Sequence, residues 1–429
     1  MCHSLLRSAT LFSISKLFCN NRKAFVQVFY NCCLAICKSN KQYSKNLSYI
    51  ANIIMKNNRR NFLKTGTVLS ASALAASMLS AIPARVTASP VTTGDNGGSK
   101  NQYRTLGSGK HSIKVSYGLG LGCMGMSFNR SFIPNTKDMI TVIRKAYEMG
   151  VTLFDTAEAY GPFTNEVLVG EAIAPFRKHI TLCSKFGFDI QNGKLTGGLN
   201  SQPAHIRAVV EQSLKRLKTD VIDLVYQHRV DPKVPMEDVA GTIKDLTKEG
   251  KIKHFGLSEA GPESIRKAHA VQPLTALQTE FSLMTREPAL EVFSVCEELG
   301  IGFVPYSPLS RAYLTGYINE RTKYIATNDN RTGLPRYKPE AIVANWGIID
   351  VLTAFGNQRG YTAAQVALAW LMAQKPWVVP IPGTTKLAHL QENLGAATVD
   401  LTPDELKQIT NDITAIKIVG DRCATPQTK

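Results

Sequence analysis

Cysteine is sparse in most of this sequence, and none stands where a metal site or a disulfide framework would need it. The chain of 429 residues has nine cysteines, of which five precede Met55, and the other four are Cys123, Cys183, Cys296 and Cys423. No CxxC pair and no cluster of cysteine and histidine has the spacing of a zinc site. The sequence therefore predicts neither a structural metal nor a fold held by disulfides.

Acidic residues are missing from the first 88 positions, which hold 12 of the 50 lysines and arginines. The rest of the chain has 38 basic residues against 33 acidic ones, a net charge of +5 compared with +17 for the whole. A nucleic-acid-binding domain gathers its positive charge on a folded surface, whereas most of this excess precedes the region of regular periodicity. We therefore expect a mildly basic globular part and no nucleic-acid partner.

Long uninterrupted apolar runs are also missing from the N-terminal part. Its most apolar stretch, residues 66 to 84, is interrupted by Ser70, Ser72, Ser77 and Ser80. Such a stretch is too polar for a comfortable membrane span, and no cysteine nearby could carry a lipid. We expect no stable membrane anchor.

A pair of arginines precedes this stretch, in the sequence RRNFLK at positions 59 to 64. With Met55 as the start, residues 55 to 88 resemble a twin-arginine export signal, with cleavage after Ala88. The resemblance implies the twin-arginine export machinery as a partner and a periplasmic or exported location, or a cytoplasmic one if the signal is not used. Residues 1 to 54 lack any clear period and are predicted to be a disordered, over-extended N-terminus. For residues 55 to 88, a basic amphiphilic tail is the alternative to an export signal.

Residues 89 to 102 are rich in glycine and polar residues and are predicted to be a linker. The segment from Tyr103 to Val115 has two short runs around Gly107-Ser108-Gly109, a pattern typical of a small hairpin. The globular domain is expected to span residues 103 to 429.

From Ser116 onward, short apolar runs alternate with segments of helical period. One such helix, Ala208 to Leu217, gathers its apolar residues on a single stripe. Eight strand–helix units in succession predict an α/β fold, a (β/α)8 TIM barrel preceded by the hairpin. The expected strands lie near 118–122, 151–155, 180–185, 221–227, 254–257, 276–279, 302–305 and 378–381. A polar loop from Tyr313 to Pro339 follows the seventh strand and is expected to shape a pocket.

Three successive strands end on side chains that can handle protons. Asp155 and Tyr160 follow the second strand, Lys185 lies near the end of the third, and His228 follows the fourth. Because the carboxyl ends of parallel barrel strands share one face, we expect these four side chains to converge. Each alone has an ordinary structural interpretation as a cap, a packed aromatic or a solvated charge; the ordered placement of all four favours a catalytic site.

The first strand carries a GxGxxG spacing from Gly120 to Gly125, and Asp155 closes the next strand as a ribose-binding acid would. These features would suit a doubly wound dinucleotide-binding fold. Asn129 and Pro134 make a helix at Gly125 unexpected, however, and eight units favour the barrel. The glycines are then expected to let a loop lie close under a cofactor at the barrel mouth.

The motifs GLGCMGMS, FDTAEAYG, SKFG, QH, GLSEA, YSPL and IPGT occur in this order along the chain. Residues 103 to 415 resemble the aldo-keto reductases in these motifs. The resemblance implies NADPH-dependent reduction of aldehydes and ketones, with a small-molecule carbonyl compound as substrate. It also identifies Asp155, Tyr160, Lys185 and His228 as the catalytic tetrad. Tyr160 would be the general acid, with a pKa lowered by Lys185, which Asp155 holds charged.

The same resemblance implies a set of contacts to NADP(H). Ser258 and Gln278 would bond the nicotinamide carboxamide and Tyr306 would stack on the ring, while Glu259 replaces a more widespread asparagine. The loop that opens the last expected helix would hold the 2'-phosphate through Thr384 and Lys386, with free N–H groups at the helix start. The complete set is Gly122, Met124, Ser258, Gln278, Tyr306, Ser307, Leu309, Arg311, Gly383, Thr384, Lys386, His389, Glu392 and Asn393.

The assignments of Tyr306 and Arg311 leave alternatives open, Tyr306 being either a stacking partner of the nicotinamide or ordinary core packing. Arg311 is either a pyrophosphate contact or a solvated arginine. His389 stands where many relatives carry arginine, and Glu392 and Asn393 match residues that reach the adenine. The function also has an alternative, since related barrels act as nucleotide-binding regulatory subunits with little turnover.

Overall fold

The computed structural model describes residues 103–423. The predicted N-terminal extension, export signal and linker, residues 1–54, 55–88 and 89–102, lie outside the described residues. The described part begins with the predicted hairpin, in which β1 (Arg104–Leu106) pairs antiparallel with β2 (Ile113–Val115). Within residues 103–423, no helix is both long enough and apolar enough to cross a membrane.

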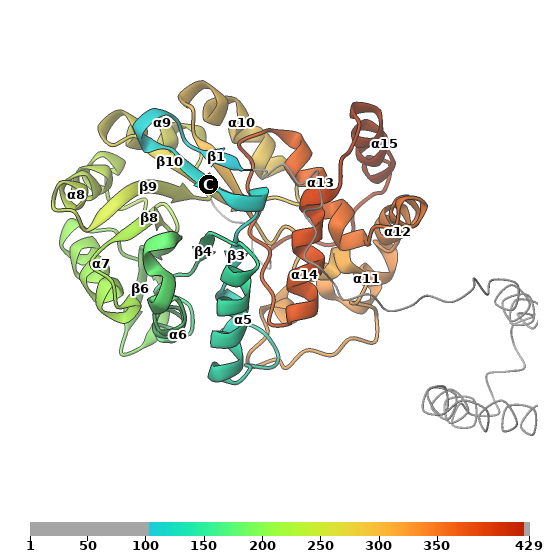
Figure 1. Ribbon diagram of the computed structural model, residues 1–429, viewed down its shortest axis with the longest axis horizontal. Coiled ribbons are helices and arrows are strands. Elements are labelled where there is room, and N and C mark those ends of the chain that lie inside the picture. The colour runs from blue at the N-terminus through green and yellow to red at the C-terminus, as the bar shows by residue number, and fades with distance from the viewer. Residues whose placement is uncertain (1–102, 424–429) are drawn as a thin grey trace, which may run out of the picture. The chain divides into compact units, whose positions relative to one another are not determined.

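A parallel sheet of seven strands forms the centre of the fold (Figure 1). The order of its strands across the sheet is β11, β10, β9, β8, β5, β4 and β3, so neighbours in the sheet are also successive parallel strands along the chain. The strands are β3 (Leu121–Gly122), β4 (Leu153–Asp155), β5 (Thr181–Phe186), β8 (Ile222–Gln227), β9 (Ile252–Ser258), β10 (Leu274–Glu280) and β11 (Gly302–Tyr306).

The predicted eighth strand closes this sheet without forming a regular ladder. Val378 makes an isolated parallel bridge to Phe303, and the N–H groups of Val379 and Ile381 donate to the carbonyl oxygens of Phe303 and Pro305 at 2.9 and 3.1 Å. On the other edge, Gly120 N–H donates to the Pro380 carbonyl at 3.0 Å. Prolines at 380 and 382 have no N–H to donate, which explains the irregular pairing. The fold is the predicted TIM barrel.

Helices follow the strands and surround the barrel (Figure 1). They are α5 (Thr136–Glu148), α6 (Thr164–Ile173), α7 (Pro203–Leu217), α8 (Met236–Lys248), α9 (Pro262–Val271), α10 (Glu287–Leu299), α11 (Pro339–Ala344), α12 (Gly347–Arg359), α13 (Ala363–Gln374), α14 (Leu387–Gly395) and α15 (Pro403–Thr414). The helix after the IPGT motif, α14, is therefore not the last helix, because α15 follows it.

Local sequence explains several helix starts. The side chain of Asn135 accepts from Lys137 N–H ahead of α5, and capping boxes at Thr362 and Thr402 begin α13 and α15. The predicted stripe of α7 is confirmed, since Val209, Val210, Leu214 and Leu217 are all buried. Apolar spacing and caps thus fix where these helices begin and which face they bury.

The interior has two layers of buried side chains. A large cluster fills the space between the sheet and the helices. A smaller one lies inside the barrel, where Leu153, Leu224, Ala276 and Val379 meet Leu106 of the hairpin. The hairpin therefore contributes to the barrel's inner core, and its short strands are held by this packing.

Two connections extend from the barrel. An antiparallel hairpin of β6 (Phe188–Gln191) and β7 (Lys194–Leu199) follows β5 and was not expected from the sequence. The predicted polar loop after β11 is confirmed, since residues 313–338 contain only the short 3-10 helices η5 (Tyr313–Thr315), η6 (Asn330–Gly333) and η7 (Pro335–Tyr337).

The doubly wound alternative is wrong. Gly125 lies in the 3-10 helix η3 (Met124–Met126), and the next α-helix begins only at Thr136. Packing within the barrel itself requires these glycines, whether or not a cofactor lies against them. A Cβ on Gly122 would lie 2.9 Å from the Ile381 carbonyl oxygen across the barrel closure. Gly120 likewise packs directly against Leu153. These glycines let the first strand approach its neighbours.

A matched pair of glycine substitutions tests the barrel packing. A Cβ at Gly256 in β9 would lie 2.5 Å from the Tyr226 ring and 2.7 Å from the Ala276 carbonyl oxygen, whereas one at Gly241 in α8 would meet nothing within 4 Å. We expect Gly256→Ala to lower the free energy of unfolding by about 1 to 3 kcal/mol, and Gly241→Ala to raise it by about 0.5 to 1 kcal/mol. Urea unfolding measures both, and equal effects would contradict the packing described here.

Candidate active site

The four predicted catalytic residues come together at the carboxyl end of the barrel. Asp155 is the last residue of β4, Lys185 lies in β5, and His228 directly follows β8. Tyr160 lies in the turn between β4 and α6. Because β4, β5 and β8 are successive parallel strands, these side chains meet on one face, as predicted.

Lys185 is the centre of this group and is almost completely buried. Its ammonium forms an ion pair with Asp155, donates to the carbonyl oxygen of Thr156 at 2.8 Å, and donates to the Tyr160 hydroxyl at 3.2 Å. These three acceptors match the three N–H donors of an ammonium. The Tyr160 oxygen therefore accepts from Lys185, and its own O–H remains available to donate into the pocket.

Burial and charge set the protonation of this group. Lys185 lowers the pKa of Tyr160 as expected, but burial raises this pKa by more, so the pKa of the buried phenol lies above its usual value. Burial alone would lower the pKa of Lys185, but the Asp155 carboxylate raises it above its usual value. Burial and the neighbouring Arg229 hold the pKa of His228 well below its usual value. At neutral pH the site has a neutral phenol, an ammonium and a neutral imidazole.

The neighbours of the tetrad restrict its geometry. Gln278 donates through Nε2 to the second oxygen of Asp155 at 2.8 Å, so this amide nitrogen already has a partner. The His228 ring meets the Tyr160 ring edge-on at 5.8 Å and the Phe188 ring at 4.8 Å between centroids. Asp155, Tyr160 and His228 are thus each fixed from at least one further side.

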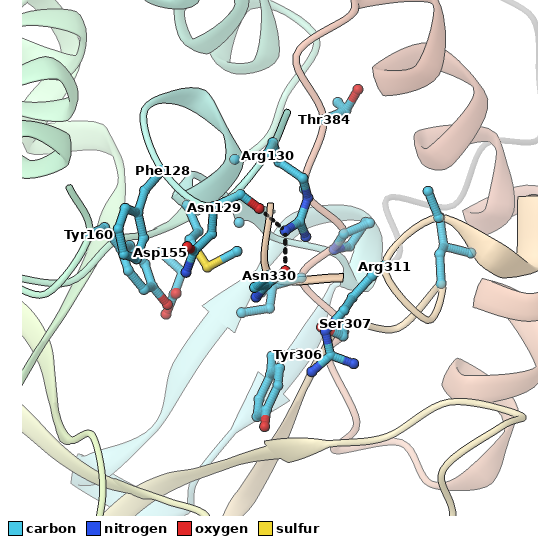
Figure 2. Close-up of a pocket in the computed structure, with 18 of the residues that line it drawn as sticks. Phe128, Asn129, Arg130, Asp155, Tyr160, Tyr306, Ser307, Arg311, Asn330 and Thr384 are labelled. Atoms are coloured by element: carbon cyan, nitrogen blue, oxygen red, sulfur yellow. Dashed lines mark hydrogen bonds between the residues drawn. The ribbon is translucent and has the colours of Figure 1, made fainter. Parts of the chain in front are cut away.

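A cavity of about 680 Å³ opens beside the tetrad. Asp155, Tyr160 and His228 line it, as do all fourteen residues predicted to bind the cofactor, whereas Lys185 lies behind Tyr160. Figure 2 shows Tyr160 and Asp155 at one side of the pocket, with Arg311, Ser307 and Thr384 at some distance from them. The pocket is in the size range of small-molecule sites and is long enough to join the tetrad to the loop before α14.

The predicted carboxamide and pyrophosphate contacts have protein partners in this pocket. The Ser258 hydroxyl accepts a hydrogen bond from Arg229 at 3.2 Å. Gln278 donates to Asp155 through its amide nitrogen, so its amide oxygen takes no part in that bond. Arg311 is not a solvated arginine, because it forms an ion pair with the buried Glu280 at 3.0 Å. Arg311 therefore reaches the pocket with its charge already balanced.

Glu259 has a different arrangement from the asparagine it replaces. Its backbone is left-handed, with φ 56°, and its carboxylate accepts from Glu280 N–H at 2.8 Å and from Arg422 at 2.5 Å. The residue is absent from the pocket lining. The Glu259 carboxylate is therefore bound to Arg422 and the Glu280 backbone and does not face the pocket.

The predicted phosphate-binding loop lies before α14. Lys386 is the N-cap residue of this helix, and its N–H donates to the Thr384 hydroxyl at 3.1 Å. His389 stacks on Tyr317 with 5.4 Å between ring centroids, which joins this helix to the long loop after β11. The lysine side chain is exposed at the helix start, where an anion would be favourable.

Several pocket residues were not identified from the sequence. Phe128, Asn129 and Arg130 come from the loop after β3, and Figure 2 shows Arg130 bonded to the Asn129 carbonyl and to Asn330. Arg229 lines the wall beside His228, and Leu195 of the unexpected hairpin reaches the rim. The sequence could have indicated Arg229 as a pocket residue, since it directly follows a predicted catalytic residue. It gave no such indication for Arg130, because an irregular loop has no periodicity.

The wider chain matches known proteins over this region. The profile of the Aldo/keto reductase family matches residues 118–412. A relative, the probable aldo-keto reductase 1 of Glycine max, is 40% identical over 322 residues, which cover 75% of this chain and 92% of the relative.

Solved structures share the fold. A thermostable aldo-keto reductase in complex with the inhibitor epalrestat is 27% identical, with a TM-score of 0.57 over 72% of this chain and 99% of that one. A glycerol dehydrogenase from Gluconobacter oxydans is 24% identical, with a TM-score of 0.64 over 77% and 98%. The holo form of an aldo-keto reductase from Bacillus halodurans is 23% identical, with a TM-score of 0.59 over 73% and 96%.

The barrel, the four converging side chains and the match over residues 118–412 all lead to one conclusion. This chain belongs to the aldo/keto reductase family of oxidoreductases.

Proposed function

We propose that this protein reduces an aldehyde or ketone to an alcohol, reversibly, with NADPH as the hydride donor. The observation that carries the proposal is the Tyr160 hydroxyl, which accepts from the buried Lys185 at 3.2 Å and lines a pocket of about 680 Å³. A phenol held in this way presents its proton to whatever oxygen enters the pocket.

The residues of the chain supply proton transfer and orientation. Bound NADPH would supply the hydride, and the carbonyl oxygen would gain negative charge as it arrives. Tyr160 donates its proton to that oxygen, and the Lys185 ammonium stabilises the phenolate that remains. The neutral His228 orients the carbonyl by a hydrogen bond. Alcohol oxidation uses the same groups in the opposite protonation states.

The pocket wall suits an extended dinucleotide. Gly122 and Gly383 both line the pocket, and a Cβ on Gly383 would lie 2.8 Å from the Gly122 carbonyl oxygen, so the two backbone segments pack closely here. Tyr306 would stack on the nicotinamide, Ser258 and Gln278 would meet its carboxamide, and Glu392 and Asn393 would reach the adenine. Lys386 and Thr384, at the start of α14, would hold the 2'-phosphate, which favours NADP(H) over NAD(H).

A regulatory subunit that binds the nucleotide without turnover is the second candidate. The assembled bonds of Lys185 to Asp155 and Tyr160 favour the enzyme, because a binding module has no need of a proton donor at the pocket end. Dinucleotide binding without oxidation across a panel of small aldehydes would favour the subunit.

We also propose export by the twin-arginine route, with residues 55–88 as the signal and the periplasm as the location. The supporting observation is the RRNFLK sequence at positions 59–64, followed by a weakly apolar stretch. This route transports folded proteins, so the barrel would cross with its cofactor bound.

Tyr160→Phe tests the role of the phenol. We expect the substitution to lower kcat for aldehyde reduction by about 10²- to 10⁴-fold, because it removes the general acid. NADPH binding, followed by fluorescence, should persist, and Tyr103→Phe, at an exposed position, serves as the control.

The pH profile tests the same role. Because burial raises the pKa of Tyr160, the acid form persists through neutral pH, and wild-type reduction should stay flat until the pH exceeds about 10. A comparable rate in Tyr160→Phe, or a decline near pH 7, would refute the assignment.

Lys386→Met tests the cofactor preference. Loss of a charge-assisted phosphate contact at this exposed position should raise KM for NADPH about tenfold, and KM for NADH should change much less. Lys407→Met, an exposed lysine on α15, is the matched control. Equal increases for both dinucleotides would show that Lys386 does not contact the 2'-phosphate.

Replacement of Arg59 and Arg60 by lysine tests the export proposal. The twin-arginine route depends on the paired arginines, so the variant should accumulate in the cytoplasm while the wild-type protein reaches the periplasm. Fractionation followed by activity assay measures this. An unchanged distribution would refute the proposed signal.

A further inference from the structure

Two of the four arginines that line the pocket are paired with buried carboxylates. Arg311 pairs with Glu280 at 3.0 Å, and Arg331 pairs with Asp329 at 2.6 Å. Arg130 and Arg229 are different, because no carboxylate of residues 103–423 lies within 4.0 Å of either guanidinium. A partly buried guanidinium without a counterion is costly unless a ligand supplies the missing charge.

The two unpaired arginines are in different parts of the pocket. Arg130 lies in the loop after β3 and bonds Asn330 at 3.2 Å (Figure 2). Besides burial, the charges of Arg331 and Arg311 lower its pKa, so both arginines lie close to it. A dinucleotide has its phosphates between its two ends, and those phosphates suit Arg130. Arg229 instead follows His228, beside the tetrad. The anion that pairs with Arg229 is therefore expected to be a group other than the dinucleotide phosphates.

The contacts of Arg229 leave most of its donors free for a ligand. Its Nη1 donates to the His228 carbonyl oxygen at 2.5 Å and to the Ser258 hydroxyl at 3.2 Å, and both acceptors are neutral. A guanidinium has five N–H donors in a rigid fork, which matches the two oxygens of a carboxylate. Arg229 is thus anchored on one side with its remaining donors unused by the described residues.

The other charges near the tetrad are already balanced. Asp155 is neutralised by Lys185, and Glu259, whose pKa Arg229 helps to lower, is paired with Arg422 at 2.5 Å. His228 is neutral because burial and Arg229 hold its pKa down. One positive charge, that of Arg229, therefore remains uncompensated at the reacting end of the pocket.

Arg229 lies close enough to the reacting groups for its charge to affect them. Burial raises the pKa values of Tyr160 and Tyr306, and Arg229 is among the groups that oppose the rise in both. Arg229, Tyr160 and His228 also line the same cavity, so one small ligand can meet all three side chains.

We propose that Arg229 binds a carboxylate on the substrate, so that the preferred substrates are oxo acids and aldehydes that carry an acid group. The inference rests on the proposed function and narrows its substrate class. The carboxylate supplies the counter-charge that the protein lacks at this point, and the fork of Arg229 fixes the carbonyl relative to Tyr160 and His228. A neutral carbonyl compound leaves Arg229 without a counterion.

The test compares acids with their neutral methyl esters. Glyoxylate, 4-oxobutanoate and 5-oxopentanoate are each assayed with NADPH beside the corresponding methyl ester, so that each pair keeps the same aldehyde and chain length while the negative charge is replaced by a neutral ester. We expect wild-type kcat/KM to be at least about tenfold higher for one or more acids than for the ester.

Two substitutions at Arg229 then assign the preference. Arg229→Gln removes the charge and should lower the ratio of acid to ester kcat/KM by about 10- to 100-fold. Arg229→Lys keeps the positive charge but lacks the forked guanidinium, so its ratio of acid to ester kcat/KM should lie between those of the wild type and Arg229→Gln. Arg266→Gln, an exposed arginine paired with Glu298 on the outer surface, is the control and should keep the wild-type ratio.

The possible failures can be told apart. Turnover of the esters as efficiently as the acids, or an unchanged ratio in Arg229→Gln, would refute the carboxylate site and leave the proposed reduction intact. Absence of turnover for all six compounds with both NADPH and NADH would refute the proposed function and this inference with it. If Arg229→Gln does not fold, the ratio in Arg229→Lys decides, and an unchanged ratio there refutes the site.

Discussion

The buried ammonium of Lys185 is the interaction on which the site depends. A lysine without solvent must have its charge compensated and its donors filled, and Asp155, the Thr156 carbonyl and Tyr160 do both. These partners come from β4 and the turn after it, so the ion pair joins two strands at the carboxyl end of the barrel. The same contacts orient the Tyr160 hydroxyl. The arrangement that stabilises the buried Lys185 is therefore also the one that directs the Tyr160 proton into the pocket.

The sequence predicted much of this because the barrel repeats a simple rule. Polar residues directly after apolar runs identified Asp155, Lys185 and His228, and parallel order placed them together. The cofactor residues came from the family resemblance, and all of them line the pocket. Predictions that depended on hydrophobic periodicity or on strand ends therefore placed the strands and helices at the right positions in the chain, although some strand lengths differ from those expected.

The rest depended on contacts between segments far apart in the chain. Glu259 pairs with Arg422, 163 residues away, and no local pattern indicates such a partner. The direction of the Tyr160 pKa shift is another case, since burial outweighs the visible lysine and burial is a property of the whole fold. The β6–β7 hairpin was missed because its sequence, with exposed residues throughout most of β7, lacks the alternation of a half-buried strand.

The irregular closure of the barrel has a consequence for stability. Only scattered backbone bonds join segment 378–382 to β3 and β11, so this seam is the least regular junction of the cylinder. Gly122 and Gly383 face each other across it and also line the pocket. A dinucleotide in contact with both glycines would bridge the two sides of the seam and favour the closed barrel by mass action. Occupancy of the pocket by such a dinucleotide and resistance to unfolding would thereby be coupled in this fold.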